Sequence, residues 1–254
     1  MSLVISPPVE KRTRTRRIVL GIGGLLGTLL FIGAVFIAAY AYVGADGETF
    51  SFFRHYVSEL GRYSVSPQAL TFNVLIIIGA FLMVPFFIEL GQFLATSASK
   101  FMSSMGIITA VSIAFIGAFS MDTPAYHKRA ATVFFLASFI AFLTFALETL
   151  SHLEHGEHVP VLTLVLIGIH QLVSFLFLGV LVADWSSLDH ILFQPATFVR
   201  PQVWWMATME WGIFLGLMVL FMGLSLEMLI ANLSLPKWEI IEQRQPTREL
   251  QQIK

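Results

Sequence analysis

The sequence predicts an all-α polytopic membrane protein in which six transmembrane helices form one bundle and both termini are cytoplasmic. The first observation is a set of long apolar stretches at residues 18–43, 69–95, 101–121, 130–150, 161–183 and 204–233. Each supplies about the 20 apolar residues that a helix needs to cross roughly 30 Å of hydrocarbon. Helices and closed barrels satisfy their backbone groups in lipid, and none of these stretches alternates as a barrel strand does.

The second observation is the composition, which is 56% hydrophobic and 12% charged. Soluble domains are about one quarter charged. The remaining segments are too short for a separate soluble domain. We therefore expect a basic cytoplasmic arm at 1–17, one transmembrane domain at 18–233 and a polar cytoplasmic tail at 234–254.

The third observation is the distribution of Lys and Arg. Five of them precede the first stretch, which is too long for the apolar core of about 7 to 15 residues in a cleaved signal peptide. The first stretch is then an uncleaved signal anchor with a cytoplasmic N-terminus. In this orientation ten Lys and Arg lie on the cytoplasmic side and five lie outside, as the positive-inside rule predicts.

Composition also limits the function classes. The formal net charge is -1 and the basic residues are divided among loops, so no basic surface for nucleic acid is predicted. The chain has no cysteine, which excludes disulfides, thiolate metal ligands and the attachment of c-type haem.

The first stretch contains Gly23 and Gly27 at GxxxG spacing. Small residues at this spacing allow two helices to approach closely in a membrane. We expect packing against a neighbouring helix of the bundle, with pairing to a second copy of the chain as the alternative.

The loop after the first stretch has apolar residues at a spacing of three and four, namely Phe50, Phe53, Val57 and Leu60. This pattern predicts a short interfacial helix. His55, Glu59 and Arg62 then share its opposite, polar face.

Ionisable residues within membrane spans are costly and mark functional sites by default. Glu89, Glu148 and Glu227 come near the cytoplasmic ends of their helices, where a charge can be solvated or paired. His170 is near the middle of the fifth span, and Glu210 is one to two turns inside the outer end of the sixth. These two are the stronger candidates for a functional role.

Polar residues of the outer loops are expected to meet Glu210 at one mouth of the bundle. Carboxylates and imidazoles gathered there can bind a lipid headgroup or a divalent cation, and a structural hydrogen-bond network is the alternative. The predicted ligand or headgroup site consists of Ser58, Glu59, Asp122, His127, His170 and Glu210. A metal would be held by Asp122, His127 and Glu210, or in the cytoplasmic loop by His152, His155 and His158.

Two loop motifs resemble a known family. Residues 53–61 read Phe-Arg-His-Tyr-Val-Ser-Glu-Leu-Gly, and residues 117–122 read Gly-Ala-Phe-Ser-Met-Asp with His127 downstream. They resemble the Ser-acid-x-Gly and Gly-x-Phe-x-x-Asp elements of six-helix membrane proteins related to the damage-regulated autophagy modulators, in their largely uncharacterised bacterial and archaeal branch. The resemblance implies a six-helix bundle and an outer polar site at Ser58, Glu59, Asp122 and His127.

A more distant comparison is with the zinc-dependent seven-helix hydrolases that include the alkaline ceramidases. Those proteins use a Ser, an Asp and three His, two of them in an H-x-x-x-H pair that this chain lacks.

No recognisable catalytic set remains, so we expect an integral membrane protein that binds a lipid or a protein partner through its outer polar site. The alternatives are an accessory subunit of a larger membrane complex and a metal-dependent membrane lipid hydrolase. The expected partners are membrane lipids and other membrane subunits, and not nucleic acid.

Overall fold

The computed structural model describes residues 11–44, 46–94, 96–155, 161–183 and 200–233. In this part of the chain there is no β-strand. The long helices are α1 (Lys11–Tyr40), α2 (Ala69–Leu94), α3 (Ser97–Ala118), α4 (Pro124–Glu154), α5 (Val161–Ala183) and α7 (Trp205–Leu233), and a short 3₁₀ helix, η1 (Val57–Gly61), precedes α2. Six helices are long and apolar enough to cross a membrane, which confirms the predicted fold class.

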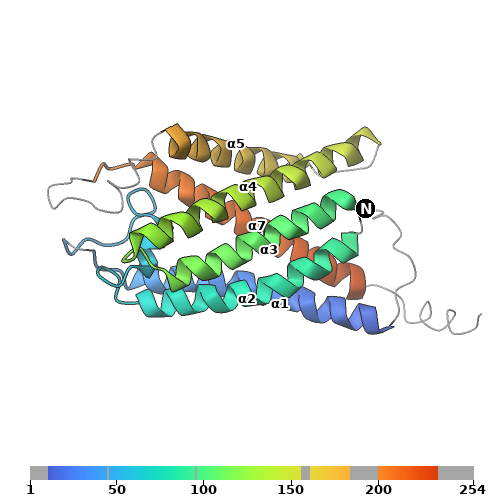
Figure 1. Ribbon diagram of the computed structural model, residues 1–254, viewed down its shortest axis with the longest axis horizontal. Coiled ribbons are helices and arrows are strands. Elements are labelled where there is room, and N and C mark those ends of the chain that lie inside the picture. The colour runs from blue at the N-terminus through green and yellow to red at the C-terminus, as the bar shows by residue number, and fades with distance from the viewer. Residues whose placement is uncertain (1–10, 45, 95, 156–160, 184–199, 234–254) are drawn as a thin grey trace, which may run out of the picture.

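The six long helices run alongside one another (Figure 1), and their contacts connect them into a closed ring. Helices adjacent in the sequence pack against each other from α1 to α5, and α7 closes the ring by packing against both α5 and α1. The start of α1 and the end of α7 lie at the same end of the bundle. At the other end η1 contacts α1, α2 and α7, and we call this the η1 end.

Local sequence signals set several helix boundaries. Thr96 caps α3, because its hydroxyl accepts a hydrogen bond from the Ser99 amide while the Ser99 hydroxyl accepts one from the Thr96 amide. Pro124 occupies the first turn of α4, where a missing amide hydrogen has no cost. α1 begins at Lys11, seven residues before the predicted start of the transmembrane domain. The predicted tail at 234–254 lies outside the described residues.

A close helix contact lies between α1 and α2. A Cβ added to Gly27 would lie 2.9 Å from the Gly79 carbonyl oxygen, and one added to Gly79 would lie 3.0 Å from the Gly27 carbonyl oxygen. Backbone atoms cannot move away as a flexible side chain can. The predicted close packing of the first stretch is therefore confirmed at Gly27, within the bundle, whereas Gly23 has only ordinary contacts.

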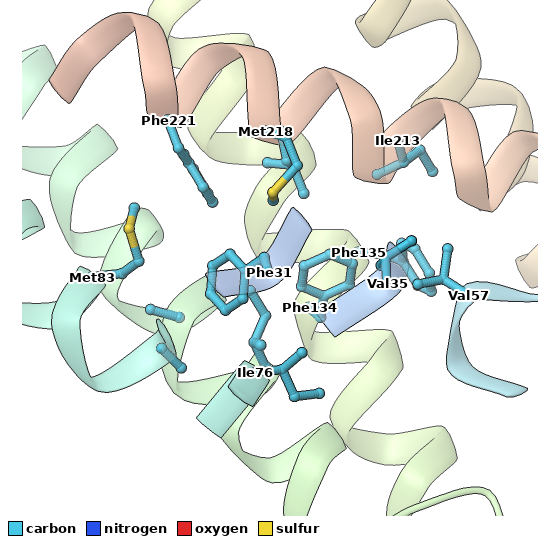
Figure 2. Close-up of a cluster of buried hydrophobic side chains, with 14 of the residues drawn as sticks. Phe31, Val35, Val57, Ile76, Met83, Phe134, Phe135, Ile213, Met218 and Phe221 are labelled. Atoms are coloured by element: carbon cyan, nitrogen blue, oxygen red, sulfur yellow. The ribbon is translucent and has the colours of Figure 1, made fainter. Parts of the chain in front are cut away.

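The core is filled by large apolar side chains that point toward the axis of the ring. Figure 2 shows Phe31 of α1 between side chains of the facing helices. Those drawn around it include Ile76, Met83, Phe134, Phe135, Met218 and Phe221. The outside of the bundle is also apolar, since Phe36, Phe81 and Phe175 are each more than 60% exposed. An apolar exterior of this extent belongs in contact with lipid.

At the end opposite η1, two carboxylates are paired. Glu89 is 2% exposed and forms ion pairs with Arg16 at 2.8 Å and Arg17 at 3.2 Å. Glu148 accepts a hydrogen bond of 2.6 Å from the Thr96 hydroxyl. These pairings link α1 to α2, and α4 to the α2–α3 turn, and they explain how carboxylates are accommodated in apolar helices.

Candidate functional site

A cavity of about 60 Å³ lies inside the η1 end of the ring. Side chains of α1, α2, α3, α4 and α7 form its walls, and Val57 and Ser58 of η1 cover it. The walls are apolar and include Phe31, Phe72, Ile76, Ile113, Phe134, Phe214 and Met218. The polar side chains in the lining are those of Ser58, His127 and Glu210.

A second cavity, of about 50 Å³, adjoins the first and shares these three polar residues with it. It extends toward α5, where Phe177 and Leu181 form its wall, and toward Tyr56 at the start of η1. The two cavities together run from the centre of the ring to the α4–α5 contact. An apolar space with few convergent polar groups is typical of a small-molecule or lipid site.

Glu210 is in the second turn of α7, and its side chain points under η1. Its carboxylate faces the backbone amides of Val57 and Ser58 and the Ser58 hydroxyl. Its Oε2 atom is buried without a hydrogen-bond partner, and among the described residues no Lys or Arg forms an ion pair with it. A buried carboxylate oxygen without a partner is costly, so this atom marks a place where a ligand group can be accommodated.

His127 is in the first turn of α4 and is 4% exposed. Its Nδ1 atom is 2.8 Å from the Phe119 carbonyl oxygen. Because a carbonyl can only accept, Nδ1 must carry the proton and donate. In the neutral ring Nε2 is then a hydrogen-bond acceptor, and the backbone fixes the orientation of the imidazole in the cavity wall.

Tyr56 contributes a donor to the second cavity. Its hydroxyl is buried and has no hydrogen-bond partner. Burial, followed by the nearby charges of Glu210 and Glu59, raises the pKa of Tyr56 above its ordinary value. The phenol therefore keeps its proton at physiological pH.

Glu59, which was predicted to belong to the ligand site, is buried, is bonded to Arg200 and lines neither cavity. The regular helix is confined to the five residues of η1, and Glu59 is 1% exposed. Its two carboxylate oxygens accept hydrogen bonds of 2.8 and 2.7 Å from Arg200. It also accepts bonds from the Tyr56 amide and the Tyr42 hydroxyl. This fully used carboxylate fixes η1 over the cavity.

The neighbouring residues of the loop are also buried or bound. His55 is 0% exposed, and its backbone carbonyl accepts a hydrogen bond from the Trp211 indole at 2.9 Å. Phe53, expected in the apolar stripe, is 57% exposed. Both residues precede η1 and lie in a turn, so the helical faces predicted for them are not formed.

Asp122 is in the turn between α3 and α4 and holds the loops together. It accepts hydrogen bonds from the Tyr63 amide at 2.7 Å and from the Ser120 hydroxyl at 2.9 Å, and Arg62 is 3.9 Å away. Partial burial opposes ionisation, but these hydrogen bonds outweigh it and lower the pKa of Asp122 below its ordinary value. Asp122 lines neither cavity.

His170 lies apart from the predicted site. It is near the middle of α5, stacks on Phe142 with ring centroids 3.8 Å apart, and is 3.3 Å from the Ser174 hydroxyl. It lines neither cavity. Its contacts are those of a packed side chain at the junction of α4, α5 and α7, where it lies against Gly216.

Within the described residues no three His, Asp or Glu side chains form a group that could hold a metal ion. The set Asp122, His127 and Glu210 is therefore not found as a metal-binding group in this part of the chain, where Asp122 accepts a hydrogen bond from the Tyr63 amide and lines neither cavity. In the other predicted set, the His155 ring bonds the Ser151 carbonyl, and His158 lies outside the described residues.

Sequence reasoning did not identify two residues that shape the site. Arg200 is 141 positions from Glu59, and Tyr56 lies in the motif at 53–61, two positions before Ser58, but was not itself selected as a site residue. The only sequence signal for Arg200 was a basic residue between two apolar spans, which we assigned to topology. A buried partner for Glu59 can be inferred only after its burial is known.

Comparisons with known proteins give one family. The family model described as "Protein of unknown function (DUF998)" matches residues 25–227, which is well over half of the chain. Comparisons with curated proteins and with solved structures found no match.

Proposed function

Since the chain belongs to the DUF998 family, whose description states no activity, we propose from the geometry of its η1 end that it binds a membrane lipid inside the bundle. The lipid places its polar end at Ser58, His127 and Glu210 and its apolar chain along the second cavity toward α5. In the orientation predicted from the Lys and Arg distribution, this site is on the outer face of the membrane.

The observation that carries the proposal is that the apolar cavities also contain a buried carboxylate, Glu210, whose Oε2 atom has no hydrogen-bond partner. A tightly packed structural bundle has few voids larger than a water molecule. Here two adjoining cavities of about 60 and 50 Å³ are kept next to Glu210. These volumes suit a polar group and the first carbons behind it, since an engineered apolar cavity of about 150 Å³ binds benzene.

The alternatives make different demands on the same residues. A metal-dependent hydrolase needs a third ligand beside His127 and Glu210, which the described residues do not provide. An accessory subunit needs a partner on the outer surface of the helices and no internal ligand. The resemblance to the autophagy-modulator relatives agrees with a six-helix bundle and carries no activity.

The test uses photoreactive decyl chains, which carry a diazirine near the terminal methyl, added to the protein in phosphatidylcholine nanodiscs. We expect labelling of cavity-lining residues such as Phe134 and Phe177, mapped by mass spectrometry. Ala131 lines both cavities, so Ala131→Leu fills them and should remove this labelling.

Ala125 is an exposed residue on the same helix, and Ala125→Leu is the matched control that should leave labelling unchanged. If Ala131→Leu labels like the wild type, or if only lipid-facing residues are labelled in the wild type, an internal lipid site is refuted. Native mass spectrometry of the same samples counts bound subunits and tests the accessory role.

A further inference from the structure

We propose that the ligand of this cavity is a lipid alcohol, whose free hydroxyl donates a hydrogen bond to Glu210 and accepts one from Tyr56. The inference rests on the proposed function and adds the chemical class of the ligand's polar end.

The first step concerns the polar groups that are left over after the protein's own hydrogen bonds are assigned. In the paired cavities Glu210 Oε2 and the Tyr56 hydroxyl are both buried without a partner. The Glu210 carboxylate, when ionised, can only accept hydrogen bonds, whereas the Tyr56 hydroxyl can donate one. The negative charge of Glu210 also acts on the Tyr56 phenol, so the two groups belong to one electrostatic environment.

The second step compares possible ligand head groups by the hydrogen bonds that each can donate and accept. A hydroxyl donates one hydrogen bond and accepts others, so it can satisfy Glu210 and Tyr56 at once. An ammonium can only donate, so it can bond Glu210 and the Tyr56 oxygen but leaves the Tyr56 hydroxyl hydrogen without an acceptor. A carboxylate, phosphate diester or ether can only accept and therefore leaves an ionised Glu210 unpaired, and the ionised Glu210 also repels an anion.

The third step concerns the other charged and polar groups around the cavities. Glu59, whose charge also acts on Glu210, is neutralised by its two bonds to Arg200. Lys128 lines the second cavity and is engaged in an interaction of its own. His127 presents Nε2 as a further acceptor, which again favours a ligand that brings a donor.

The site should bind an alcohol much more tightly than the other head groups, because leaving a buried polar group unpaired costs more free energy than a hydrogen bond contributes. Sites that hydrogen-bond a ligand hydroxyl reject analogues lacking it far more strongly than apolar pockets reject ligands that differ only in size. We expect at least tenfold selection for the alcohol over a group that leaves a donor or acceptor of either residue unpaired.

The experiment uses four photoreactive decyl chains that differ only in the head: hydroxyl, ammonium, carboxylate and methyl ether. In wild-type protein in phosphatidylcholine nanodiscs, the alcohol should label the cavity about tenfold more than each of the others. If all four head groups label the cavity equally and Ala131→Leu still abolishes the labelling, the preference for an alcohol is refuted. The internal lipid site is then still supported. Stronger labelling by the ammonium or the carboxylate also refutes the preference for an alcohol.

Two variants remove one hydrogen-bonding partner each. Glu210→Met should remove the advantage of the alcohol over the ether, and Tyr56→Phe should narrow its advantage over the ammonium. Glu227→Met and Tyr63→Phe are the matched controls, because these residues line neither cavity, and they should retain the wild-type order. If a cavity variant does not fold, the four-head comparison in the wild type decides the question alone.

Discussion

Removal of the Arg200 guanidinium should destabilise the η1 end more than any other single change to a loop charge. Arg200 donates to both oxygens of Glu59, at 2.8 and 2.7 Å, and to the Arg54 carbonyl at 3.0 Å. The Arg200 and Glu59 side chains are 13% and 2% exposed. Arg200→Gln would leave the carboxylate buried without its counter-charge.

The size of the effect follows from the geometry. Breaking a buried ion pair by removing one partner costs about 3–5 kcal/mol. Glu59 keeps hydrogen bonds from the Tyr56 amide and the Tyr42 hydroxyl, so we expect the lower end of that range, about 3 kcal/mol. Glu59→Gln should cost about 2 kcal/mol, because the remaining guanidinium is partly exposed and can be hydrated.

The double variant is the sharper test. Once Arg200 is gone, removing the charge of Glu59 relieves an unpaired carboxylate, so Arg200→Gln with Glu59→Gln should cost about 3 kcal/mol and not the sum. The expected coupling energy is about 2 kcal/mol. Equilibrium unfolding in mixed micelles, followed by far-ultraviolet circular dichroism, measures all four proteins.

The control is the surface pair of Arg62 and Asp122, whose side chains are 27% and 30% exposed and 3.9 Å apart. Arg62→Gln should cost less than about 1 kcal/mol. If the Arg200 and Glu59 effects add to within about 0.5 kcal/mol, the two residues do not stabilise the loop as a pair and the reasoning fails.

Three further changes give separate checks. The pKa of Asp122 is lowered on folding, so its contribution to stability is present above its ordinary pKa and is lost as the pH falls through the lower, folded value. The difference in stability between the wild type and Asp122→Asn should therefore disappear in acid. A difference that does not depend on pH would contradict this. Gly27→Ala should cost about 1–3 kcal/mol, because its Cβ meets the Gly79 carbonyl oxygen. Gly33→Ala, which meets nothing within 4 Å, should be neutral or stabilising by up to about 1 kcal/mol, and equal effects at the two glycines would refute the close helix contact.

Features that depend on local composition were predictable from the sequence. The six spans follow from hydrophobicity, because each long helix must satisfy its own backbone in lipid. Small residues in the first span indicated a close helix contact, which occurs at Gly27. Ser58, His127 and Glu210 were selected because polar groups near an apolar bundle end are costly unless they are used or paired.

Features that depend on the directions of side chains were not predictable. Glu59 and Glu210 are both acidic residues near the same end of the bundle, yet only Glu210 lines the cavities. The difference is made by Arg200, which is distant in the sequence and neutralises Glu59 alone. Likewise, Asp122 and His127 are five residues apart, but only His127 lines the cavities, whereas Asp122 accepts a hydrogen bond from the Tyr63 amide.

The sequence by itself therefore determined that this is a six-helix membrane protein with a few polar groups at one end, because hydrophobic length and periodicity are properties of each segment alone. Only the tertiary structure decided which of those groups share a cavity. A hydrogen bond of about 3 Å depends on how segments more than 100 residues apart are packed, and no local pattern records that distance.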